Sequence, residues 1–354
     1  MKLKHSLIAL AALAAVSAAN AQSNVTLYGR VDLGYQFNNK VNAAGDSLSE
    51  LKNGGIAPSI WGLRGTEDLG SGLSAFFNLE SHFYGDTGQL EGAGRLFRRQ
   101  ANLGVKGAFG SVALGRQYSP ALLAHLGTDP RGFKEQFSML YPYALNQTTA
   151  PDTLNDLGIF LANAVSYTNS FGPVNVGAAY AFGEQAGKFS AGRTASIGGS
   201  YTGPVTVSAS YQQIKNVAGT GDTKQWGLGG AVPLGPVKAK ILYLRTKSDA
   251  GVLAGAETNV GVWGVGVDYV WGANTSTVAY YQGKDKETSG ALTDKTKTLV
   301  LSNDYALSKR TTLYAQLAYA DYDAGSTART SIIAGPVVAG EKQTVFGLGI
   351  KHDF

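Results

Sequence analysis

Catalysis needs a nucleophile, a base and an acid close together, and this chain has few residues that could supply such a set. It has no cysteine, and beyond residue 21 its histidines are His82, His125 and His352. No serine, histidine and acid stand at a spacing typical of a catalytic set. His82 falls on the polar face of a predicted strand, as a solvated residue, and His125 falls in a loop. The glycine-rich stretch 227–230 lies inside a strand pattern, which indicates close packing and no phosphate-binding loop. We expect no metal or other cofactor.

Charged residues around segment 117–160 indicate a different kind of chemistry. The segment carries apolar residues that a loop in open solvent would not need, and four acids: Asp129, Glu135, Asp152 and Asp156. Folding it inward would bury the apolar residues and turn the acids toward a basic wall. The candidates for that wall are Arg30, Arg64, Arg98, Arg99, Lys106 and Arg116. Opposed walls of this kind create a transverse field, which sorts solutes by charge without any reaction.

Strands are the elements that must position these residues. From Val25 to Phe37, apolar residues alternate with polar ones, and Arg30 falls on the polar face. The same period of two recurs at 205–212, 262–271, 312–319 and 346–354. Alternation also turns Arg64 inward. Arg98 and Arg99 are adjacent, so a regular strand points only one of them inward, and the pattern leaves open which.

Short and long connections alternate along the chain. Seven short links, six of which contain Gly or Pro, begin near residues 67, 108, 171, 202, 234, 272 and 307. Eight longer polar segments lie near 38–55, 85–94, 117–160, 184–193, 214–223, 247–257, 284–294 and 323–341. They predict an all-β fold, a 16-stranded antiparallel transmembrane barrel with its long third loop folded into the lumen. A soluble β-sandwich would not explain the alternation.

The first 21 residues have the pattern of a cleaved secretory signal. A short positive start precedes an apolar stretch, and Ala19 and Ala21 offer small residues at a cleavage site. The barrel is therefore expected to span residues 22–354. The content of 47 Gly, 18 Tyr and 14 Phe suits short strands and tight turns. The net charge of +5 is dispersed without a basic run, so we expect no nucleic-acid partner.

Several motifs resemble those of Gram-negative general porins, most closely the neisserial and burkholderial branch. They are residues 25–32, 61–70, 99–101 and 114–118, and the alternating last strand that ends in Phe354. The resemblance implies passive diffusion of ions and small solutes through a homotrimer, which is exported through the periplasm and lies in the lipid and lipopolysaccharide of the outer membrane. It implies an eyelet formed by the third loop, with Arg30, Arg64 and Arg99 in the basic wall. It identifies Phe354 as a signal for the outer-membrane assembly machinery.

The sequence departs from this branch at two positions, and two alternative functions remain to be considered. Porins of this branch often carry arginine where this chain has Ile60 and Ser166, so the basic cluster is thinner and the expected anion selectivity is weak. One alternative is a substrate-specific channel with a solute-binding constriction, for which Tyr28 and Tyr84 are the suggestive inward aromatics. The other is a barrel enzyme, which would need a loop-borne nucleophile beside His82 or His125.

Overall fold

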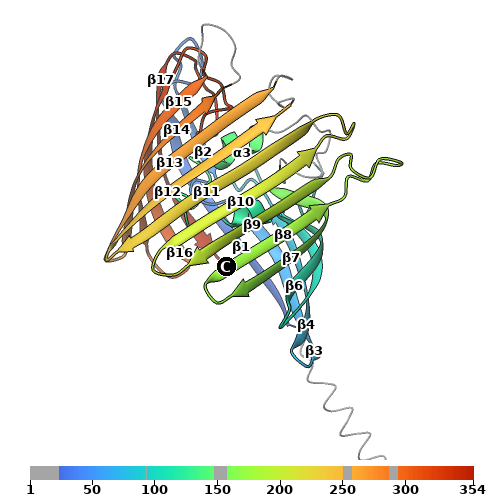
Figure 1. Ribbon diagram of the computed structural model, residues 1–354. Helices are drawn as coiled ribbons and strands as arrows, with labels where there is room; N and C mark the ends of the chain where they lie inside the picture. The colour runs from blue at the N-terminus through green and yellow to red at the C-terminus, as the bar shows by residue number, and fades with distance from the viewer. Residues whose placement is uncertain (1–23, 93, 147–157, 250–256, 287–293) are drawn as a thin grey trace, which may run out of the picture.

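A single antiparallel sheet accounts for most of the chain. The computed structural model describes residues 24–92, 94–146, 158–249, 257–286 and 294–354. The first strand, β1 (Asn24–Asn38), pairs with the last, β17 (Lys342–Asp353), so that the sheet closes into a barrel (Figure 1). Closure pairs the backbone groups of both edges, which a protein in lipid requires.

The remaining strands follow one another around the barrel in chain order, and two short helices lie between β6 and β7 in the chain. They are β2 (Leu48–Asn53), β3 (Ile60–Gly70), β4 (Leu73–His82), β5 (Gln100–Gly107), β6 (Gly110–Tyr118), α2 (Pro120–Leu123), α3 (Leu140–Leu145), β7 (Phe160–Phe171), β8 (Val174–Ala181), β9 (Thr194–Thr202), β10 (Thr206–Lys215), β11 (Asp222–Leu234), β12 (Val237–Ser248), β13 (Thr258–Trp271), β14 (Asn274–Asp285), β15 (Lys295–Ala306) and β16 (Thr311–Tyr322).

The barrel has sixteen strands, as predicted, because β2 and β3 together form one of them. β2 pairs with the second half of β1, from Leu33 to Asn38, and β3 pairs with its first half, from Asn24 to Arg30. Residues 54–59 leave the ladder between these two segments. This interruption lies beside the pore and receives the third loop.

The short turns lie at one end of the barrel and the long loops at the other. The first turn falls at Ser71 and Gly72, further along the chain than predicted, because β3 continues through an irregularity between Asp68 and Gly70. Gly70 and Gly72 have φ angles of 83° and 77°, which glycine adopts without strain. Short turns face the periplasm in bacterial outer-membrane barrels, so the long loops face outward.

The outer face of the barrel is apolar, as a lipid-facing surface must be. Leu27, Leu103 and Leu228 point outward and are each more than half exposed. Residues that share a register row with an inward residue also point inward, so Thr26, Arg64 and Asn78 line the lumen together. Among the described residues, no helix is long and apolar enough to cross a membrane.

The lumen is partly filled by a hydrophobic core that belongs to two loops. The third loop, residues 119–159, carries α2 and α3 inside the ring of strands (Figure 1). The eighth loop, residues 323–341, packs beside it. Loop residues of this core are Leu122, Phe133, Phe137, Met139, Tyr143, Ile332 and Ile333, and wall residues include Leu242, Leu244, Val260, Val262, Val300 and Val345. The inward folding of the third loop is therefore confirmed.

Glycines on the barrel wall let the third loop approach closely. A Cβ atom on Gly198 would lie 2.2 Å from the Pro120 carbonyl oxygen. One on Gly227 would lie 2.5 Å from His125 Nε2, and one on Gly229 would lie 2.3 Å from Thr128 Oγ1. These contacts confirm that the stretch 227–230 contains close-packing positions.

Candidate pore constriction

His125 anchors the first part of the third loop to strand β10. Its Nδ1 and Nε2 atoms lie 2.8 and 2.7 Å from the hydroxyl oxygens of Ser208 and Ser210. Thr128 Oγ1 lies 2.6 Å from the same Ser208 hydroxyl. The histidine is 1% exposed, so it is a buried anchor of the loop and no free base.

This anchor makes the docking of the third loop sensitive to acid. Burial lowers the pKa of His125 from its ordinary 6.5 to about 4. A released loop would bind a proton on His125 between these values and the docked loop would not, so docking weakens as the pH falls through this window. The loss is about 1.4 kcal/mol per pH unit. We expect single-channel current to be steady at neutral pH and to flicker progressively as the pH approaches 4.

A His125→Gln variant provides the control for this prediction. Glutamine retains hydrogen bonding to the serine hydroxyls but does not titrate. Its current noise should therefore stay constant from about pH 7 to about pH 4. If His125→Gln flickers in acid as much as the unchanged protein, another group is responsible.

The tip of the third loop docks on the interruption between β2 and β3. The Glu135 N–H donates to the Ile56 carbonyl at 3.4 Å, and the Gln136 N–H donates to the Gly55 carbonyl at 3.3 Å. The Gln136 side chain donates to the Gly54 carbonyl at 3.2 Å. These bonds fix the backbone of Glu135, whose half-buried carboxylate interacts electrostatically with Arg99.

Asp32 holds the interruption in the shape that receives this tip. Its Oδ2 atom accepts the N–H groups of Ile56 at 2.9 Å and Ala57 at 2.8 Å. Its Oδ1 atom accepts the Tyr314 hydroxyl at 2.6 Å. The side chain is fully buried, so these three donors replace water around the carboxylate. Sequence analysis did not single out Asp32.

Arg99 faces the lumen and is neutralised by Glu80. Its Nε atom lies 2.7 Å from Glu80 Oε1, and Tyr28 donates its hydroxyl to Glu80 Oε2 at 2.9 Å. The guanidinium also contacts the Tyr118 hydroxyl and lies 5.2 Å from the centre of the Phe160 ring. The basic wall is therefore a paired network at this point, and Glu80 is a member that sequence analysis did not assign to it.

The other predicted basic residues differ in how they are paired. Arg30 Nε lies 2.6 Å from Asp353 Oδ1. Arg98 pairs with Glu91 of the second long loop, outside any regular strand, and its carbonyl accepts a bond from Arg116. The argument that only one of Arg98 and Arg99 points inward therefore does not apply, because neither residue lies in a regular strand. The Arg64 guanidinium lies 5.0 Å from the centre of the Tyr28 ring.

Two of the four predicted acids, Asp129 and Glu135, lie among the described residues, and they are placed differently. Asp129 is fully buried beneath the loop, where its Oδ1 accepts the N–H groups of Arg131 at 2.9 Å and Phe133 at 2.8 Å. Its expected position at the pore is therefore wrong, because the carboxylate closes a turn inside the loop. Asp152 and Asp156 lie outside the described residues. Glu135 lies close enough to Arg99 to interact with it electrostatically, and its role at the constriction stays a prediction.

The eighth loop supports the third loop and was missed as its partner. The Ser138 N–H donates to the Ile332 carbonyl at 2.9 Å, and Phe137 forms an isolated bridge with Ile333. The signal was present in the sequence, because residues 332–338 form an apolar run within a segment predicted to be an extracellular loop.

His82 and His352 occupy ordinary structural positions. His82 is 6% exposed and its Nδ1 lies 2.9 Å from Glu91 Oε2, so the expectation of a solvated lumen residue is wrong. His352 Nδ1 lies 2.9 Å from the Thr311 hydroxyl, beside a short turn at the periplasmic end of the barrel. In the described ranges of the chain, no group of three His, Asp or Glu side chains could hold a metal ion.

Comparisons with known proteins agree with this geometry. A family model described as Gram-negative porin matches residues 9–325. The outer membrane porin protein 32 of Delftia acidovorans is 36% identical over 374 residues, covering 99% of this chain and 100% of that one. A solved anion-selective porin from Comamonas acidovorans has a TM-score of 0.81 at 32% identity, covering 94% of this chain and 100% of that one. A trimer form of OmpT from Vibrio cholerae shares the fold, with a TM-score of 0.67 at 17% identity over 94% and 99% of the two chains.

Proposed function

The chain belongs to the family of Gram-negative porins, and from that membership we propose that its channel is weakly anion-selective. As an outer-membrane porin it provides passive diffusion for small solutes. The selectivity is set where the third loop narrows the lumen, between Glu135 and the wall that carries Arg99. A relative with the same fold at 32% identity is an anion-selective porin, which supports the proposed preference for anions over cations.

The imbalance of charge along the lumen wall, from the constriction to its periplasmic side, carries this proposal. Arg30, Arg98 and Arg99 each pair with an acid. Arg64 and Lys106 lie in the lumen and share a cavity whose lining, among the described residues, contains no carboxylate. The wall therefore keeps an excess of positive charge, which attracts anions. Hydrophobic and hydroxyl side chains at Ile60 and Ser166 add no charge, which keeps the preference weak.

The proposal extends to assembly, processing and the absence of catalysis. Residues 1–21 are a cleaved signal, outside the described part of the chain, and the working channel is a homotrimer. Phe354 aids insertion, and its N–H and carbonyl pair with Gly29 at 3.0 and 3.1 Å. The engagement of His82 and His125 in structural contacts supports a channel without enzymatic activity.

Single-channel current under a salt gradient tests this proposal. We expect large currents that close in three equal steps. The reversal potential should have the sign that a higher permeability to anions than to cations produces. Glu135→Gln should shift this potential further toward anions, because it removes the negative charge of the constriction. Glu341→Gln is the matched control, since it removes an exposed rim carboxylate that pairs with Lys40. A cation-selective potential would contradict the proposal, and so would an equal shift in both variants.

A further inference from the structure

A polar cavity with two cations lies on the periplasmic side of the constriction. Its volume is about 360 Å3. Strands β1, β3, β4, β5 and β6 contribute its lining, which comprises Asn24, Thr26, Arg64, Gly65, Thr66, Phe76, Asn78, Lys106 and Ser111. Arg64 and Lys106 are the only charged residues in this lining, so no carboxylate offsets them there.

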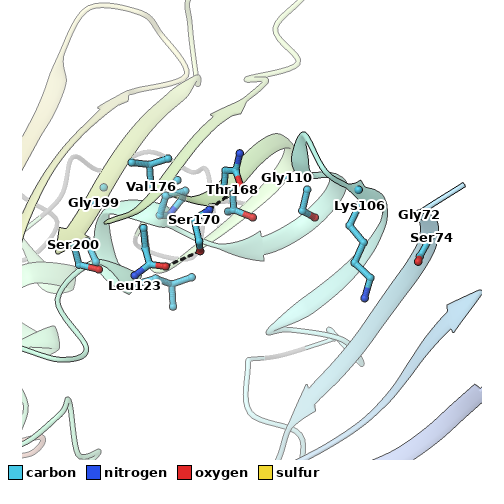
Figure 2. A pocket seen from close by; sticks show the side chains of 18 residues that line it. Gly72, Ser74, Lys106, Gly110, Leu123, Thr168, Ser170, Val176, Gly199 and Ser200 are labelled. Carbon is cyan, nitrogen blue, oxygen red and sulfur yellow. Dashed lines mark hydrogen bonds between the residues drawn. The ribbon is translucent and has the colours of Figure 1, made fainter. Parts of the chain in front are cut away.

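A second, larger cavity continues from the first along the wall. It has a volume of about 630 Å3 and shares Lys106 and Ser111 with the smaller one. Figure 2 shows the Lys106 side chain pointing from the wall into open space near Ser74, with Ser170 and Ser200 further along. Lys106 is again the only charged residue of the lining, and the rest is hydroxyl, amide, glycine and apolar.

Both cations are available for a solute. The Arg64 guanidinium rests against the Tyr28 ring, which orients its plane without consuming its N–H donors. Asp68 shares the register row of Ser74 and Lys106. Its carboxylate accepts the Gly70 N–H at 2.9 Å and lines neither cavity.

The spacing of the two cations suits a solute with two separated negative charges. Arg64 projects from β3 and Lys106 from β5, with β4 between them, so their strands are about 10 Å apart. Their register partners on β4, Asn78 and Ser74, are four residues apart, which adds about 13 Å along the strands and places the two Cα atoms about 16 Å apart. Both side chains are long, and arginine binds a carboxylate through two parallel hydrogen bonds while lysine acts as a point charge. The hydroxyl and amide groups of Thr26, Asn78 and Ser111 supply further hydrogen bonds.

We propose that Arg64 and Lys106 form a binding site for small organic dianions in the periplasmic vestibule, distinct from the constriction at Glu135 and Arg99. The site rests on the proposed function, because a solute reaches it only through an open channel. A dianion that has passed the constriction is held there before release. Chloride entering the same vestibule then meets an occupied site, so the dianion reduces chloride current in a saturable way.

Chloride conductance in about 0.1 M KCl, where screening is modest, tests this site. Succinate is added in steps, and acetate at matched ionic strength is the monovalent control. Succinate should reduce the current to a plateau and acetate should not. The double variant Arg64→Gln, Lys106→Gln should raise the half-blocking succinate concentration by about tenfold, because two charge-assisted contacts are lost.

Lys238→Gln is the matched control for the total charge of the lumen. Lys238 shares a register row with inward-facing Asp268 on the opposite part of the barrel, and it lines neither cavity. An equal loss of succinate block in Lys238→Gln would overturn the site, and so would a current that responds alike to succinate and acetate. In both cases the porin would still conduct. Absence of any current from the folded protein would instead overturn the proposed function.

Discussion

Replacing Asp32 by alanine is expected to release the tip of the third loop and to make the open-channel current noisy, with brief partial closures. The substitution leaves the N–H groups of Ile56 and Ala57 and the Tyr314 hydroxyl buried without their acceptor. Loss of a buried, hydrogen-bonded charge costs about 3–5 kcal/mol. Because residues 54–56 bind the loop tip through their carbonyls, the effect reaches Glu135.

Two measurements follow the release of the loop in Asp32→Ala. The heat-modifiable band of the barrel should convert at a lower temperature, and the current variance at fixed voltage should rise. Asp32→Asn should be intermediate, since an amide oxygen can still accept from one side of the site. Glu50→Gln is the control, because Glu50 accepts the Gln36 amide at 3.1 Å near the interruption without contacting the loop tip. Unchanged noise in Asp32→Ala would show that the loop tip is held elsewhere.

The strand count could be read from the sequence because alternation is strict and the turns are short. A one-residue slip would move a whole strand face from water to lipid, so the pattern is strongly specified. The interruption at 54–59 could not be read, because Gly54 and Gly55 continue what looks like the first long loop. Its function depends on Asp32 and on Tyr314, which are 282 residues apart.

The alternation of polar and apolar residues could not predict which acid each arginine pairs with. Arg99 and Glu80 meet because the Arg99 N–H donates to the Glu80 carbonyl at 3.1 Å, which continues the β4–β5 ladder. A long loop joins these strands, and only a tight turn fixes the register in advance. Alternation places a residue inside or outside, but it does not say which residue of the neighbouring strand it meets.

The error at Asp129 has a local physical cause. The sequence supplied an acid in an inward-folded loop, and charge alone suggested that it faces the pore. The N–H groups two and four residues further on close a turn around its carboxylate instead. Asp is favoured in turns for this capacity. Glu135 lacks such partners in the described structure and keeps its electrostatic contact with Arg99.

Arg131→Met is expected to detach the third loop from the barrel wall as severely as Asp32→Ala does. Arg131 is buried and donates to the Phe137 carbonyl at 2.7 Å and to Gln316 Oε1 at 2.8 Å. It also balances the buried charge of Asp129. Two further ion pairs complete the surroundings. Lys134 of the loop pairs with Asp304 of the wall at 2.6 Å, and Lys240 pairs with Asp268 within the wall at 2.7 Å.

These six residues carry three positive and three negative charges, so removal of any one leaves an uncompensated charge beneath the loop. Loss of Arg131 alone should cost about 3–5 kcal/mol, visible as a lower conversion temperature and a noisier current. The double variant Asp129→Asn, Arg131→Met restores neutrality, and the asparagine oxygen can still accept the backbone N–H groups. It should recover roughly half of the loss, which a double-mutant cycle measures. A double variant with the summed defect of both single variants would show that hydrogen bonds of Arg131, and not charge balance, hold the loop.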